Sequence, residues 1–174
     1  SCLIDQYRDE MRCPVLSVVQ AGADAVAATP YQRVGVISTC FTAQSGCYPN
    51  LIHKQAPERQ VFSHGCPDLA NLVEQNVGDP AAQPAIDAEI RAGLDGLVNV
   101  DKIQCCVLGC THYPLVEDNI RRLYPTLDLL DPARQMAETL SRDLDARGLR
   151  NDQRAPGRMD IFTTGSLEEY IKKA

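Results

Sequence analysis

A short apolar run that ends at a glycine most constrains what this chain can fold into. Residues 103–108 have the length and β-branched content of a buried strand, and Gly109 ends the run. Pro114 favours the start of a helix over residues 115–123, whose free N–H groups would face the carboxyl end of the strand. Ligands bind at such strand ends in open α/β sheets. The reactive side chains between the strand and the helix are Cys110, Thr111 and His112.

These three residues suit proton transfer on a small anion. A thiol, with an ordinary pKa of about 8.5, becomes a usable base when a helix N-terminus and an imidazole favour the thiolate. Cys110 and His112 are two residues apart, so a sharp turn must bring them together, and Thr111 offers a hydroxyl and an N–H to a carboxylate. The alternative is a buried structural cysteine beside a capping threonine, and the residue types alone leave both readings open.

Strand-like and helical patterns alternate along the chain, which is typical of βαβ units. We therefore predict an α/β fold with a parallel sheet. Strands are expected over residues 15–19, 33–38, 61–63, 103–108, 127–130 and 158–163. Helices are expected over residues 1–12, 22–29, 66–74, 85–97, 115–123, 132–144 and 167–172, with a turn at 64–65 and a loop over 148–157.

A second polar turn follows the strand at residues 33–38. Thr39 and Thr42 lie three residues apart where a strand gives way to a helix, and their hydroxyls together with free N–H groups would form a carboxylate cradle. Plain helix capping without a ligand explains the same spacing.

Composition narrows the class of partner. A net charge of −6 with scattered basic residues argues against nucleic-acid binding, and no segment resembles a membrane span or a secretory leader, so we expect a cytoplasmic protein. The eight cysteines invite a zinc site, but no Cys-x-x-Cys pair occurs. Cys105 and Cys106 would point to opposite faces of a strand, so we expect no metal. No phosphate-binding glycine pattern is present, so no cofactor is expected.

Three motifs resemble those of the glutamate racemases, in the cofactor-independent aspartate/glutamate racemase superfamily. The run Leu-Gly-Cys-Thr-His-Tyr-Pro at residues 108–114 is similar to the second catalytic motif of that family, and the pattern over residues 35–48 to its substrate-binding turn. Residues 66–74 are similar to a Cys-Pro-x-Leu-x-x-x-Val-Glu stretch whose glutamate supports the active-site histidine. Aspartate racemases usually carry an acidic residue in place of His112.

The resemblance implies a role for each residue of the motifs. Cys110 would be the catalytic acid or base in the interconversion of L- and D-glutamate, assisted by His112 and Glu74. The substrate would be bound by Thr39, Thr42, Thr111 and His112. No cofactor or metal is implied, and the D-glutamate would serve peptidoglycan synthesis, with a homodimer as one assembly to consider.

The resemblance also implies two lobes, each contributing one cysteine. Residues 25–138 would form the second lobe, and residues 1–24 and 139–174 a remnant of the first. The Cys-Asn-Thr motif that carries the family's other cysteine does not occur in this sequence, and Cys2 is no substitute because no Asn-Thr follows it. We therefore expect a fragment that is inactive alone. The rival functions are an aspartate or related racemase and a noncatalytic binding protein on the same fold.

Overall fold

The computed structural model describes residues 4–76, 78–151 and 157–173. These residues contain one parallel sheet with the strand order β2-β1-β3-β4. Its strands are β1 (Arg33–Ser38), β2 (Gln60–Gly65), β3 (Cys105–Leu108) and β4 (Asp128–Leu130). Because the strands are parallel, their carboxyl ends meet at one edge. The prediction of an α/β fold on a parallel sheet is confirmed.

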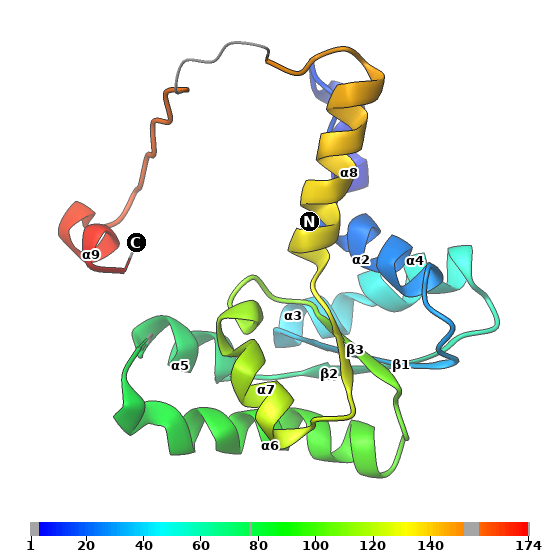
Figure 1. Cartoon of the computed structure of the whole chain (residues 1–174), viewed down its shortest axis with the longest axis vertical. Helices are drawn as coiled ribbons and strands as arrows, with labels where there is room; N and C mark the ends of the chain where they lie inside the picture. Colours follow the sequence, from blue (N-terminus) through cyan, green and yellow to red (C-terminus); the bar gives the residue numbers. More distant parts are fainter. Residues whose placement is uncertain (1–3, 77, 152–156, 174) are drawn as a thin grey trace.

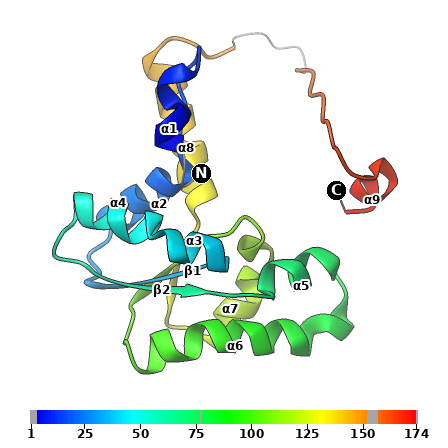
Figure 2. The same ribbon diagram turned by 180° about the vertical axis from the view of Figure 1, so that it is seen from behind.

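Helices cover both faces of the sheet (Figures 1 and 2). One face carries α2 (Val18–Ala27) and α4 (Cys47–Gln55), and the other carries α5 (Leu69–Gln75), α6 (Gln83–Asn99) and α7 (Glu117–Leu123). Helix α3 (Cys40–Ser45) begins directly after β1. The remaining elements are α1 (Ile4–Tyr7), η1 (Arg8–Glu10), η2 (Pro80–Ala82), η3 (Tyr113–Val116), α8 (Pro132–Ala146) and α9 (Leu167–Lys173).

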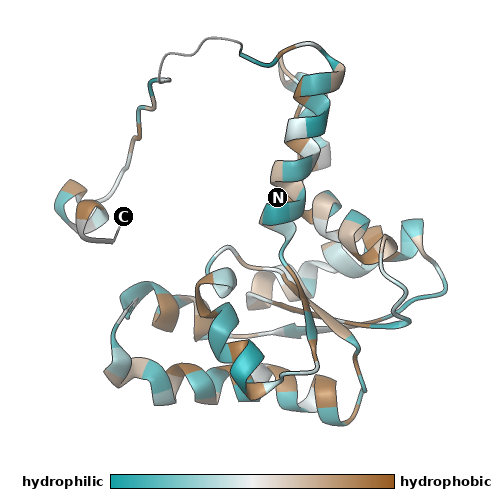
Figure 3. Ribbon diagram, viewed as in Figure 1, coloured by the Kyte–Doolittle hydropathy of each residue, from teal (hydrophilic) through white to brown (hydrophobic). Residues whose placement is uncertain are grey.

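Strand β3 separates two apolar cores. Cys106 packs with Ile37 and Leu94 on one face, whereas Cys105 packs with Val34 and Val26 on the other. The alternation follows from the two-residue period of a strand. The central strands are coloured as hydrophobic in Figure 3, as expected for strands that are buried on both faces. Two adjacent cysteines therefore lie in different layers of the protein.

Two predicted strands are wrong. Residues 15–17 form no strand, because the Ser17 hydroxyl accepts a hydrogen bond from the backbone N–H of Gln20 (3.2 Å) and starts α2 at Val18. Residues 158–163 are extended but belong to no strand, and Met159 and Phe162 are exposed. An isolated extended segment has no neighbouring strand to satisfy its backbone groups.

Several predicted boundaries also shift. Helix α7 starts at Glu117 rather than at residue 115, because η3 occupies Tyr113–Val116. The expected turn at residues 64–65 is the end of β2. The expected N-terminal helix is broken into α1 and η1, and residues 1–3 lie outside the described residues, as do 152–156 of the expected loop.

Helix α8 packs against α2 and extends away from the sheet (Figure 1). Helix α9 lies apart from the sheet. The carboxylate of Asp131 caps α8 by accepting a hydrogen bond from the N–H of Ala133 (2.9 Å). Within the described ranges, no helix is long and apolar enough to cross a bilayer.

Candidate active site

Gly109 brings the carboxyl ends of β1 and β3 together. Its N–H donates to the carbonyl of Ile37 (2.8 Å) and so continues the strand ladder by one residue. A Cβ atom at this position would lie 2.9 Å from the Ile37 oxygen and 3.1 Å from the Cβ of Ser38. Only a glycine allows this approach without a shift of the backbone. The chain then leaves the sheet at Cys110, next to the turn that begins at Thr39.

A tight turn and the end of α5 bring together three of the residues expected at the site. The N–H of Tyr113 donates to the carbonyl of Cys110 (3.1 Å), and this turn places Cys110 Sγ 3.8 Å from His112 Nδ1. The other ring nitrogen, Nε2, lies 3.4 Å from Glu74 Oε2 at the end of α5. The imidazole therefore links a half-buried thiol to a carboxylate from another element.

The environment of Cys110 favours the neutral thiol. Burial raises its pKa above the ordinary value for cysteine, and the backbone N–H of His112 opposes this in part. The sequence suggested that a helix N-terminus would favour the thiolate, but a 3₁₀ turn follows His112 and α7 begins only at Glu117. Cys110 therefore holds its proton more strongly than an exposed cysteine.

The two threonines of the other turn contact each other. Thr39 Oγ1 accepts a hydrogen bond from the N–H of Thr42 (3.5 Å) and donates to Thr42 Oγ1 (3.1 Å), so Thr39 caps α3. Gly65, at the end of β2, packs on this cap, since a Cβ there would lie 2.8 Å from the Cα of Cys40. The hydroxyl pair lies at the same sheet edge as Cys110, and its geometry fits both a plain cap and a carboxylate cradle.

Thr111 is exposed and lies beside a residue that the sequence analysis did not place at the site. Cys110, Thr111 and Asp131 line a small hollow of about 40 Å³. Asp131 was not among the site residues expected from the sequence, but it directly follows β4, the neighbour of β3. Its position after the next parallel strand was the signal that could have identified it.

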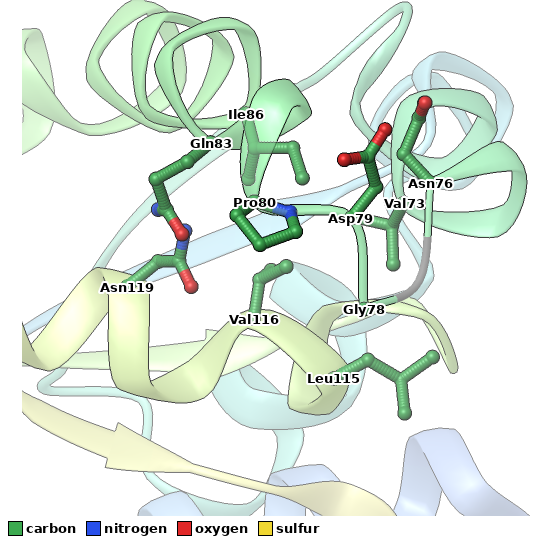
Figure 4. Close-up of a pocket in the computed structure, with 10 residues that line it drawn as sticks. All are labelled: Val73, Asn76, Gly78, Asp79, Pro80, Gln83, Ile86, Leu115, Val116 and Asn119. Atoms are coloured by element: carbon green, nitrogen blue, oxygen red, sulfur yellow. The ribbon is translucent and has the colours of Figure 1, made fainter.

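A larger cavity, of about 300 Å³, is lined by residues of α5, η2, α6, η3 and α7 and by none of the threonine turn (Figure 4). Val73, from the helix that carries Glu74, and Leu115, from the turn after His112, line it together with Pro80 and Ile86. None of the site residues expected from the sequence lines this cavity. Among the described residues, no group of three or more histidine, cysteine, aspartate or glutamate side chains could hold a metal ion.

Comparisons with known proteins assign the chain to a family. The family model for Asp/Glu/Hydantoin racemase matches residues 2–140. The glutamate racemase of Levilactobacillus brevis is 36% identical over 160 residues, which are 90% of this chain and 56% of that protein. The glutamate racemase of Trichormus variabilis is 38% identical over 150 residues, which are 85% of this chain and 49% of that protein. The chain thus spans about half the length of these relatives.

Solved structures show the same fold. A glutamate racemase isoform from Bacillus anthracis superimposes with a TM-score of 0.85 at 31% identity, over 96% of this chain and 62% of that one. The Francisella tularensis glutamate racemase, in complex with D-glutamate, gives 0.76 at 28% identity, over 87% of this chain and 56% of that one. The match over residues 2–140, the relatives and the parallel-sheet architecture agree, and the chain belongs to the Asp/Glu/Hydantoin racemase family.

Proposed function

We propose that this chain provides one half of the active site of a cofactor-independent glutamate racemase. The observation that carries the proposal is the contact from Cys110 through His112 to Glu74, at the sheet edge that also holds the threonine turn. A thiol next to an imidazole can exchange a proton with a carbon acid, and the nearby carboxylate orients the ring and balances its charge. The relatives named glutamate racemase support glutamate as the substrate.

In the proposed reaction, the sulfur of Cys110 takes the α-proton of glutamate or returns one to it. The α-proton is weakly acidic, so the carbanion must be stabilised by donors around the carboxylate and by exclusion of water. Thr39, Thr42 and Thr111 are the proposed donors, and His112 is proposed to contact the substrate. Inversion requires a second thiol on the opposite face of the α-carbon, and the Cys-Asn-Thr motif that would supply it is absent from this sequence.

Deuterium exchange at the α-carbon tests the proposal. The purified 174-residue chain is incubated in D₂O with L-glutamate and, separately, with D-glutamate, and loss of the α-proton signal is followed by NMR. We expect slow exchange of one enantiomer and no measurable interconversion, because one thiol serves only one face. Faster exchange of aspartate would favour the related aspartate racemases. If the purified chain interconverts the enantiomers, the proposal of a half-site is wrong. If neither enantiomer exchanges its α-proton, the proposed proton transfer is wrong.

Glu74→Gln is expected to slow this exchange about tenfold, equivalent to about 1.4 kcal/mol in the barrier, because the amide cannot balance a charged imidazole. The free energy of unfolding should change by less than about 1 kcal/mol, since the side chains of His112 and Glu74 are 32% and 53% exposed. Glu58→Gln is the matched control, because Glu58 is an exposed ion-pair partner of Arg59. An equal loss of exchange in both variants would contradict the proposed role of Glu74.

The organisation of the larger protein is part of the same proposal. Residues 25–138 are proposed to form one lobe of the racemase, and residues 1–24 and 139–174 the returning edge of the other. Apolar side chains are exposed on these flanking segments, which supports the proposal that another protein surface covers them. A second copy of the chain is one candidate. The exposed side chains include Tyr7, Met11, Leu140 and Leu149. A cytoplasmic role in supplying D-glutamate for peptidoglycan is proposed from the family.

A further inference from the structure

The cavity of about 300 Å³ between α5, α6 and α7 is not used by the proposed reaction. Its volume is at the lower end of the range for pockets that bind small organic molecules. The apolar part of its lining combines the buried side chains of Val73, Ile86 and Val116 with the exposed side chain of Leu115. The cavity therefore offers an apolar surface to the body of a small ligand that enters from solvent.

The polar side chains of the lining lie at two ends of the cavity (Figure 4). Gln83 and Asn119 are at one end, whereas Asn76 and Asp79 are at the other. At the first end, both amide nitrogens donate to the Oδ1 atom of Asp87, from Gln83 at 2.8 Å and from Asn119 at 3.1 Å. Because the nitrogens are turned toward Asp87, the carbonyl oxygens of these two amides are left as acceptors for a ligand.

The second end of the cavity is also rich in acceptors. The amide nitrogen of Asn76 donates to the carbonyl of Leu72 (2.8 Å), which leaves the Asn76 carbonyl oxygen as an acceptor. Asp79 accepts a hydrogen bond from the N–H of Ala81 through Oδ1 (2.9 Å), and its Oδ2 atom is a further acceptor. Among the described residues that line the cavity, Asp79 carries the only formal charge. The polar lining thus presents mainly hydrogen-bond acceptors and one negative charge.

A lining of this kind favours a cation over other small molecules. An ammonium group has three hydrogen-bond donors and no acceptor, so it can satisfy several of these oxygens at once. Its hydrogen bond to the Asp79 carboxylate would be charge-assisted and therefore stronger than one from a neutral hydroxyl. An anion of the same size would meet the negative charge of Asp79 and carbonyl oxygens that cannot donate to it. The chemistry of the lining therefore specifies both parts of a ligand, an apolar body and a cationic donor.

We propose that this cavity is a binding site for a small organic ammonium ion, with the charged group at the Asp79 end and the apolar body against the buried aliphatic side chains. The site adjoins the proposed reaction centre, because Val73 directly precedes Glu74, and η3, which also lines the cavity, directly follows His112. A bound ligand would contact both elements that hold the pair of His112 and Glu74. The inference goes beyond the racemase chemistry, and its test requires no turnover.

The test is an NMR titration of the ¹⁵N-labelled whole chain at pH 7 with three compounds of similar size. These are benzylammonium, the neutral benzyl alcohol and the anionic benzoate. We expect benzylammonium to shift the amide signals of cavity residues and to saturate in the range of about 1–10 mM, which is reasonable for so small a ligand. Benzyl alcohol should bind at least about fivefold more weakly, because it lacks the ion pair with the exposed carboxylate of Asp79. Benzoate should not saturate.

Asp79→Asn removes the charge and keeps the hydrogen bond to Ala81, because asparagine caps helices as well as aspartate does. We expect this variant to bind benzylammonium at least about fivefold more weakly and to bind benzyl alcohol as the parent chain does. Asp68→Asn is the matched control, since it changes the net charge equally. Asp68 is exposed at the opposite end of α5, makes no capping hydrogen bond with its side chain and does not line the cavity. Its replacement should leave both affinities unchanged.

Several results would overturn the proposal. One is the absence of saturable benzylammonium binding up to about 10 mM, and another is equal affinity for benzylammonium and benzyl alcohol. Signal changes that map to residues outside the cavity would place the ligand elsewhere. An affinity for benzylammonium that is unchanged in Asp79→Asn, or that falls equally in Asp68→Asn, would show that the carboxylate at the cavity does not select the cation.

Discussion

Replacing Cys110 with alanine is expected to lower the rate of α-deuterium exchange in glutamate by about 10²–10⁴-fold, to the background of the buffer. This range is the usual contribution of a positioned acid or base. The sulfur follows the carboxyl end of β3, and His112 Nδ1 lies 3.8 Å from it, so the variant would keep the imidazole and lose the group that is proposed to reach the substrate. The measurement is the NMR assay in D₂O described above.

Cys13→Ala is the control for this variant. Cys13 is an exposed free cysteine in the segment between η1 and α2. Its removal should leave exchange unchanged. Exchange that persists in Cys110→Ala, or that is lost equally in Cys13→Ala, would show that another group moves the proton.

Gly109→Ala is expected to lower the free energy of unfolding by about 1–3 kcal/mol, the usual cost of overpacking. The new Cβ would meet the backbone oxygen of Ile37 at 2.9 Å and the ring of Tyr48 at 3.1 Å, and neither can move without disturbing β1 or the core. The same shift would separate Cys110 from the threonine turn, so exchange should fall as well. Denaturant unfolding of the variant and of the parent chain measures the difference.

Gly96→Ala is the matched control, because a Cβ at Gly96 in α6 would have no neighbour within 4 Å. Alanine is the better helix former, so this variant should be as stable as the parent chain or up to about 1 kcal/mol more stable. Equal stability of the two variants would mean that β1 and β3 do not approach as closely as described.

The sequence was a good guide to the sheet and a poorer one to its surroundings. The apolar runs of β1 and β3 are buried on both faces, and their short length and β-branched residues favoured strands. The strand predicted over residues 15–19 was wrong because a short apolar run fits a strand and a buried helix equally well. Contacts of α2 with α4 and α8 decide between them, and these elements lie far along the chain.

The candidate site was also predicted only in part from the sequence. Local order predicts that Cys110 and His112 share a turn, because they are two residues apart after a strand. The spacing of 38 residues between Glu74 and His112 carries no such information, and only the family resemblance indicated their contact. Asp131 was not expected at the site, because the adjacency of β3 and β4 is a property of the folded chain.

Cys105 and Cys106 are buried on opposite faces of the sheet, so each thiol can report on the opening of one layer of helices. Burial raises the pKa of both thiols, that of Cys105 to about 12, so neither reacts with a thiol reagent while its own layer of helices stays closed. Local opening exposes one layer at a time in many proteins. Labelling at the two neighbouring positions would therefore record, from one peptide, which side of the sheet loosens first.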